Sequence, residues 1–460
     1  MKSATARLPS TSELQWINFS PDRLLVPAIL CFWVLCFIGF SEPDDWRVSR
    51  FGVTPILPPV VLKAMKLFGR GGAFGVMAFC LLGVWKHPKR HHVIVVMAPM
   101  LMFGAYGVVS TSWSALKSTS LQQSATFFMV LMLATYIGIV WRSDRDTERI
   151  VKNLALAIFA LSIVMIALRF GMPRSGALTK DSAGVLHSTA ACASGGLCIL
   201  LTLAARLLWK SPWSSWWFPI VSIELGMMLL AGNRLSVLVT ALTVFALFVI
   251  ALHRGFAALC LLVGAVTLSG YLVCDPKLTL VEAMGKDVGA FAKQDQTKSQ
   301  LGSFSGRSEM WEQIWRSYSK SPLIGHGYFV TSETGRIYVW HEWGNWTAHN
   351  AVLQTLVTLG AIGLLLLALG LGSLTIGVIS ALRRVKGIEN STMLLILISM
   401  WYLGWSFLNE SFTGPLQPEV IVFGAMVGVA AGIGGAARSE TLRANRSNPH
   451  ASLRSRVLQP

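Results

Sequence analysis

Long apolar runs recur along almost the whole chain, and short polar gaps separate them. A membrane-spanning helix needs about 20 mostly apolar residues, and about twelve runs approach that length. These runs are residues 23–40, 65–85, 92–112, 122–141, 150–170, 186–208, 215–232, 235–252, 256–274, 351–380, 392–409 and 415–435. Because backbone hydrogen bonds must be satisfied internally within lipid, the pattern predicts an all-α integral membrane protein.

The composition supports the same class. The chain is 53% hydrophobic and 13% charged, whereas soluble globular chains carry about 25% charged residues. The formal net charge of +17 does not indicate nucleic acid binding, because the basic residues lie in the gaps between apolar runs. The seven cysteines lie inside these runs or at their ends, which favours packing roles over a disulfide or metal framework.

The basic residues gather in alternate gaps, and this bias orients the chain. With the N-terminus in the cytoplasm, the strongly basic segments 86–91, 142–152 and 383–386 all lie inside, which also places the C-terminus inside. The segment KHPKRHH is then an orientation signal, with metal binding as a weaker alternative. The polar, basic tail after Ala437 is expected to be disordered.

One polar stretch, residues 275–350, is much longer than the other gaps. Nine runs precede it, so it is expected on the outer, periplasmic side. Within it, GRSEMWEQIWRSYSKSP predicts an amphipathic helix that rests on the bundle or on the membrane interface and ends before Pro322. The residues expected on its apolar face are Met310, Trp311, Ile314, Trp315 and Tyr318.

The predicted organisation therefore has five parts. They are a cytoplasmic N-tail (1–22), helices one to nine (23–274), the periplasmic loop (275–350), helices ten to twelve (351–435) and a basic cytoplasmic tail (436–460).

Two arginines need an explanation, because ionisable groups at membrane depth are costly. Arg234 lies in the short connection between the seventh and eighth runs. It provides a fork for a phosphate, or alternatively it snorkels to the headgroups. Arg307 begins the amphipathic helix, where acidic residues are usually favoured. An anion beside Arg307 would explain its position, and a solvated surface charge is the alternative.

His349 and Asn350 directly precede the tenth run. Asn350 has the residue type of a helix N-cap. His349 is a candidate general base, because the positive end of the helix dipole disfavours the imidazolium form. The alternative for His349 is an ordinary interfacial residue. Glu224 lies in the middle of an apolar run, and its partner and role cannot be assigned from the sequence.

Several other chemistries lack their motifs. A zinc site at His341, Glu342 and His349 is a weak alternative, because HEWGNWTAH does not have the H-E-x-x-H spacing. Neither the phosphate-binding motif G-x-x-x-x-G-K-[ST] nor the hydrolase motif G-x-S-x-G occurs. A reaction at this site therefore needs a membrane-borne substrate that carries its own leaving group.

The segment GRSEMWEQIWRSYSKSPLIGHGYF, followed by TAHNAVLQTLVTLGAIGLLLL, resembles the O-antigen ligase and polymerase superfamily. The residues that match the pattern of this family are Arg307, Trp311, Pro322, Leu323, Gly325, Gly327, His349, Asn350 and Gly360. Weaker similarities lie at Trp113-Ser114 and in GNRLSVLVTAL, where Asn233 replaces the usual serine. GVLHSTAACA departs further, with His187-Ser188 in place of an asparagine environment.

The resemblance implies a fold similar to the C-type glycosyltransferases and a metal-independent, inverting glycan transfer without a cofactor. The implied donor is a glycan on undecaprenyl diphosphate, and the acceptor is lipid A-core for a ligase. For a polymerase, the acceptor is another lipid-linked repeat of an O-antigen or exopolysaccharide. By the same resemblance, Arg234 and Arg307 bind the diphosphate and His349 activates the acceptor hydroxyl. Asn350, Trp311, Gly325 and Gly327 support the site.

Two alternatives stay open. The sequence does not distinguish a ligase from a polymerase. A twelve-helix transporter is the alternative from another class, but no repeated halves are visible and the unusual polar residues gather on one face rather than at the membrane midplane.

Overall fold

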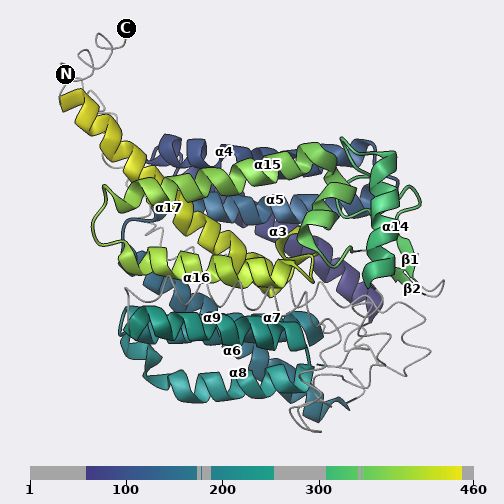
Figure 1. Ribbon diagram of the computed structural model, residues 1–460, viewed down its shortest axis with the longest axis horizontal. Coiled ribbons are helices and arrows are strands. Elements are labelled where there is room, and N and C mark those ends of the chain that lie inside the picture. Colours follow the sequence, from purple (N-terminus) through teal and green to yellow (C-terminus); the bar gives the residue numbers. More distant parts are fainter. Residues whose placement is uncertain are drawn as a thin grey trace, which may run out of the picture.

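The computed structural model describes residues 58–173, 178, 188–252, 307–339, 343–345 and 347–447. These residues form a bundle of long helices, with a shorter helix and a small hairpin at one end (Figure 1). The helices in the first part of the chain are α3 (Pro59–Gly83), α4 (Arg90–Val109), α5 (Lys117–Val140), α6 (Asp144–Gly171), α7 (Ser188–Leu208), α8 (Trp217–Ala231) and α9 (Arg234–Leu252), with single 3-10 turns η1 (Ser110–Ser112) and η3 (Pro212–Trp216).

The second part supplies one helix that crosses the end of the bundle and three long helices that return to it. These elements are α14 (Arg307–Lys320), β1 (Ile337–Val339), β2 (Trp343–Asn345), α15 (Ala351–Leu382), α16 (Glu389–Ser406), the turn η4 (Ser411–Thr413) and α17 (Pro418–Ser447). Helix α17 continues well past the predicted end at 435. The start of the tail after Ala437 is therefore helical, and the prediction of disorder there is wrong.

Within the described residues, eight helical segments are long and apolar enough to cross a membrane. They comprise α4 with η1, α5, α6, α7, η3 with α8, α9, α15 and the apolar part of α17. Two of the predicted runs, 23–40 and 256–274, lie outside the described residues. The remaining two correspond to α3 and α16, which are helical but are not among the eight. A multi-pass helical membrane protein is confirmed, whereas the count of twelve stays a prediction.

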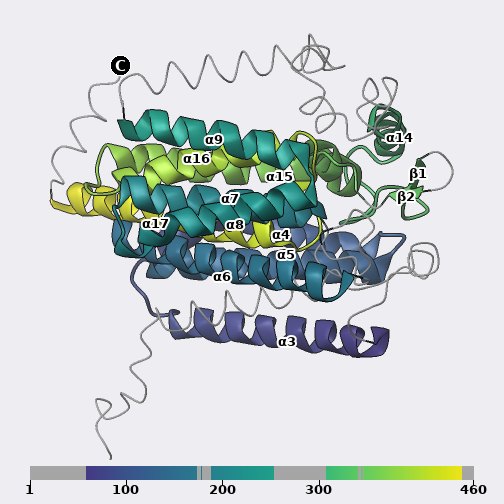
Figure 2. The same cartoon turned by 90° about the horizontal axis from the view of Figure 1, so that it is seen from below.

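Helix α17 forms the centre of the bundle. The most apolar part of α17 is 94% buried, whereas the corresponding part of α15 is only 22% buried. Small residues allow this close packing. At Gly428, for example, a Cβ would lie 2.6 Å from the carbonyl oxygen of Ala134 on α5. Helix α3 lies at the edge of the bundle (Figure 2).

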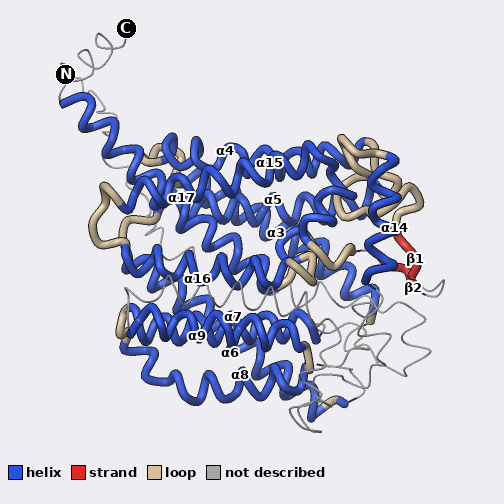
Figure 3. Tube along the Cα trace, viewed as in Figure 1, coloured by secondary structure: helices blue, strands red, loops and turns tan. Residues whose placement is uncertain are grey.

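The amphipathic helix is confirmed as α14, but its buried face differs from the prediction. Met310, Ile314 and Ser317 are buried, whereas the side chain of Trp315 is 54% exposed. The hairpin of β1 and β2 lies beside α14 (Figure 3) and pairs Ile337 with Asn345. The apolar pattern did not predict this hairpin, because its strands are only three residues long.

Helix α15 is broken at Gly360, which has a φ of 68° and a ψ of −169°. The turn that follows α14 is hydrogen-bonded into this break. The carbonyl oxygens of Pro322 and Leu323 accept from the amides of residues 361 and 362, at 2.8 and 3.2 Å. The amides of His326 and Gly327 donate in return to the carbonyls of residues 357 and 358, at 3.1 and 2.9 Å. These four bonds fix the position of α14 relative to the first turns of α15, where the candidate site lies.

Candidate active site

His349 lies two residues before the first residue of α15, at the end of the bundle that carries α14. The next residue, Asn350, is the N-cap of α15, because its Oδ1 accepts from the amide of Leu353 at 2.9 Å. The cap predicted for Asn350 is therefore confirmed. Its amide nitrogen also donates to the carbonyl of Phe407 at 3.0 Å, which ties the start of α15 to the end of α16.

The peptide before His349 is held from two sides. The amide of Ala348 donates to Oε1 of Gln354 at 2.7 Å, and its carbonyl accepts from the indole Nε1 of Trp311 at 2.8 Å. His349 itself has a φ of +47°, a left-handed conformation that is costly for a residue with a Cβ. Trp311 thus links α14 to the peptide directly before His349.

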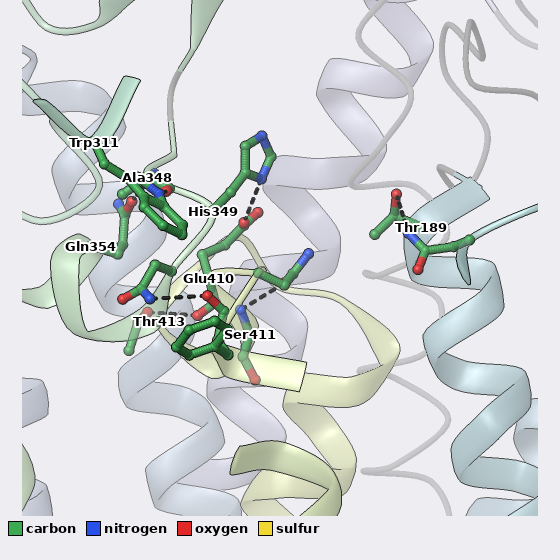
Figure 4. A network of polar contacts seen from close by, with 12 residues as sticks. Thr189, Trp311, Ala348, His349, Gln354, Glu410, Ser411 and Thr413 are labelled. Atoms are coloured by element: carbon green, nitrogen blue, oxygen red, sulfur yellow. Dashed lines mark hydrogen bonds and ion pairs between the residues drawn. The ribbon is translucent and has the colours of Figure 1, made fainter. Parts of the chain in front are cut away.

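A carboxylate that the sequence pattern did not indicate contacts His349. Nδ1 of His349 lies 3.2 Å from Oε2 of Glu410 (Figure 4). The imidazole is 35% exposed and the Glu410 side chain is 8% exposed. Because a carboxylate only accepts hydrogen bonds, this contact places the neutral imidazole proton on Nδ1 and leaves Nε2 as the basic nitrogen.

The turn between α16 and α17 fixes the position of Glu410. Asn409 Oδ1 accepts from the Ser411 amide at 2.8 Å, and the Glu410 carbonyl accepts from the Thr413 hydroxyl at 2.7 Å. Ser411 also has a positive φ, of 52°. A Cβ at Gly414 would overlap the Glu410 side chain, so glycine is required there for space. Strained backbone on both sides of the His349–Glu410 contact is typical of functional sites.

The two predicted arginines each begin a helix. Arg234 is the first residue of α9 and Arg307 is the first residue of α14, and both are partly buried. Asn233 caps the start of α9, because its Oδ1 accepts from the Ser236 amide at 3.0 Å. Gly232, with a φ of 68°, ends α8 directly before it. Asn233 is therefore a helix cap in the position where the related pattern has serine.

Charge interactions connect Arg307 to Glu410 and also to Arg234. Burial lowers the pKa of Arg307, the charge of Glu410 opposes this change, and the charge of Arg234 adds to it. Burial alone would raise the pKa of the Glu410 carboxyl, but the hydrogen bond and charge of His349, together with the charge of Arg307, hold that pKa below its ordinary value. Glu410 is therefore an anion beside His349 and Arg307.

Gly325 and Gly327 lie in the turn that follows α14. Their φ values are 66° and 104°, and a Cβ on either would overlap neighbouring atoms, at Thr358 and at Ser114 respectively. The Gly327 contact also places the predicted Trp113-Ser114 segment beside this turn. Both glycines thus allow the turn after α14 to enter the break in α15.

Other sequence candidates lie away from the site or outside the described residues. Glu224 is fully buried in α8 and accepts from the Ser162 hydroxyl at 2.9 Å. His187, His341 and Glu342 lie outside the described residues. Among the residues that the structure describes, no three His, Cys, Asp or Glu side chains group closely enough to hold a metal ion.

The fold and site define a multi-pass helical membrane protein with a histidine, a glutamate and two arginines at one end of its bundle. The family model described as O-Antigen ligase matches residues 219–368, from α8 into α15. This part of the chain is therefore similar to the O-antigen ligase family. The matched segment contains Arg234, Arg307 and His349, but it ends before Glu410. No curated protein matches the chain.

Proposed function

We propose that this protein transfers a glycan from undecaprenyl diphosphate to a sugar hydroxyl at the periplasmic face of the bacterial inner membrane. The observation that carries the proposal is the His349–Glu410 contact of 3.2 Å beside Arg307. A base, an orienting carboxylate and cationic groups for a leaving group are what a glycosyl transfer from a lipid diphosphate requires.

In the proposed reaction, Nε2 of His349 takes the proton of the acceptor hydroxyl while that oxygen attacks the anomeric carbon. The bond from this carbon to the diphosphate oxygen breaks, and its electron pair stays on the diphosphate. Glu410 holds the Nδ1 proton and stabilises the imidazolium that forms. The imidazole is partly exposed, so its extra proton can return to water after the transfer.

Arg234 and Arg307 are proposed to bind the diphosphate. Both lie at helix N-termini, where backbone amides and the helix dipole favour anions. Bidentate guanidinium groups stabilise the charge that grows on the leaving oxygen. This arrangement supports a mechanism that does not depend on a metal.

One base and one leaving group suffice for a single displacement, which inverts the anomeric centre. A double displacement needs a nucleophilic carboxylate at the anomeric carbon. Glu410 is the described carboxylate nearest to this role, but it is buried and bonded to His349. The proposal therefore predicts inversion, and the anomeric configuration of the product checks it by NMR. A retained configuration would assign the nucleophile role to Glu410 instead.

Reconstitution tests the function. Purified protein in vesicles is given a lipid-linked oligosaccharide together with lipid A-core. One transfer to lipid A-core means a ligase, and a ladder on the lipid carrier means a polymerase. A protein that makes neither product from either acceptor would contradict both.

The arginine role has a matched control on the same helix. Arg307→Gln is expected to raise the KM for the lipid-linked donor at least tenfold, because a charged hydrogen bond to the diphosphate is lost. Arg316→Gln should leave KM unchanged, since Arg316 is exposed and pairs with Glu312 at 2.6 Å. Equal effects of the two variants would show that only the general surface charge matters.

A further inference from the structure

A second polar feature lies at the opposite end of the bundle from His349. Helix α5 begins beside the turn after α14, where the Ser120 hydroxyl donates to the Tyr328 carbonyl at 2.8 Å. The 24 residues of α5 extend about 36 Å, roughly the thickness of a membrane. The last turn of α5 and the first turns of α6 therefore lie on the other membrane face.

A cavity of about 170 Å³ opens between these two helix ends. Its apolar wall consists of Ile137, Val140, Trp141 and Ile150. Trp141 is 1% exposed, so this wall is continuous with the buried core. Such a wall suits an acyl chain or a glycerol backbone better than a free ion.

The polar wall is basic. Arg149, Lys152 and Asn153 line it from α6, and the side chains of Arg149 and Lys152 are exposed. Lys89 adds a further positive charge nearby, because its Nζ donates to the Trp141 carbonyl at 3.2 Å. Basic pockets between membrane helices are suited to anionic lipid headgroups.

The one carboxylate in the cavity wall is already bonded. Oδ2 of Asp146 accepts from the backbone amides of Arg142 and Ser143, at 2.8 and 3.3 Å, as part of a capping box at the start of α6. Its ion pair with Arg149 is longer, at 3.6 Å, and the Arg149 side chain is 64% exposed. Exposed pairs of this kind contribute little to stability, so a phosphate can compete for Arg149.

We propose that this cavity binds the headgroup of an anionic phospholipid of the leaflet opposite to the candidate active site. The phosphate would contact Arg149 and Lys152, and the glycerol and first acyl carbons would lie against Val140 and Ile150. A lipid at this position would join α5 to α6. The proposal depends on the membrane-spanning fold and not on the glycan transfer.

Thermal unfolding of the purified full chain tests it, with added phosphatidylglycerol or cardiolipin compared with phosphatidylcholine. A ligand of the folded state raises the unfolding temperature. The anionic lipids are expected to raise it for the wild type, and phosphatidylcholine is not. The double variant Arg149→Ala/Lys152→Ala should need roughly tenfold more anionic lipid for the same shift.

Two further variants separate the cavity from charge in general. Arg383→Ala/Arg384→Ala removes two exposed basic residues elsewhere on the same membrane face and should keep the wild-type response. Asn153→Phe fills the cavity, keeps both charges and should lose the response. An equal loss in both double variants, or a wild-type response in the α6 double variant or in Asn153→Phe, would overturn the proposal. None of these results would affect the proposed glycan transfer.

Discussion

Glu224 and Glu410 are both buried carboxyl groups in a largely apolar chain, yet their neighbours differ in kind. Glu224 lies within α8 and accepts from the Ser162 hydroxyl, close to the thiol of Cys198. Glu410 lies in the turn after α16, beside His349 and within the field of Arg307. Uncharged neighbours suit a structural carboxyl group, whereas a histidine and an arginine suit an anion that orients a base. Burial alone therefore does not distinguish the carboxylate that is proposed to orient the base from a structural one.

The largest expected difference is between the transfer rates of two variants in which glutamine replaces one buried glutamate. Glu410→Gln should lower the rate on the order of 10²-fold or more, because the amide no longer stabilises the imidazolium. Glu224→Gln should stay within about threefold of the wild type per folded molecule, because Glu224 is bonded to Ser162 on α6 rather than to His349. Initial rates, normalised to monodisperse protein, measure both. If Glu224→Gln were the more damaging change, the comparison would be reversed.

Two glycines, one near each glutamate, test whether the position of the carboxyl group matters for transfer. Gly414→Ala places a Cβ into the Glu410 side chain, so a rate loss of roughly tenfold is expected from misplacing the carboxylate. Gly226→Ala lies two residues from Glu224, and its Cβ would meet nothing within 4 Å. It should keep the wild-type rate and, if anything, stabilise α8. A wild-type rate for Gly414→Ala would mean that the position of Glu410 is not critical.

The smallest expected effect is on stability in acid. The folded-state pKa of Glu410 lies below its unfolded value of 4.5. Its contribution to stability is therefore complete above that value and is lost as the pH falls through the lower folded pKa. Below pH 4.5, wild-type protein should lose stability more steeply than Glu410→Gln. Thermal unfolding between about pH 3 and about pH 6, a range that brackets the carboxyl pKa, measures how steeply each protein loses stability. Identical pH dependence of the two proteins would contradict the ion pair between Glu410 and His349.

Much of the fold follows from the apolar runs, because a spanning helix is specified by its own composition. The start of α14 at Arg307, its end before Pro322 and the cap at Asn350 are also local signals. The break at Gly360 is not local, because it depends on hydrogen bonds from the turn after α14. The exposure of Trp315 likewise depends on which face meets α15.

No sequence signal near His349 indicates Glu410, because the two residues are 61 positions apart along the chain. Topology offered a signal, however. Helices α15 and α16 cross the bundle in opposite directions, so the turn after α16 returns to the end where His349 lies. An acidic residue in that turn was therefore a candidate partner for the histidine. The contact between Glu410 and His349 still depends on the positive φ at Ser411 and on the close approach at Gly414. No local sequence pattern predicts either feature.

The most direct test concerns His349 itself. Reconstituted His349→Ala should bind the lipid-linked donor with the wild-type Kd, because the two arginines are intact. Its single-turnover transfer should be slower by on the order of 10³-fold, because the base is lost. Transfer at the wild-type rate would show that His349 is not the base and would contradict the account.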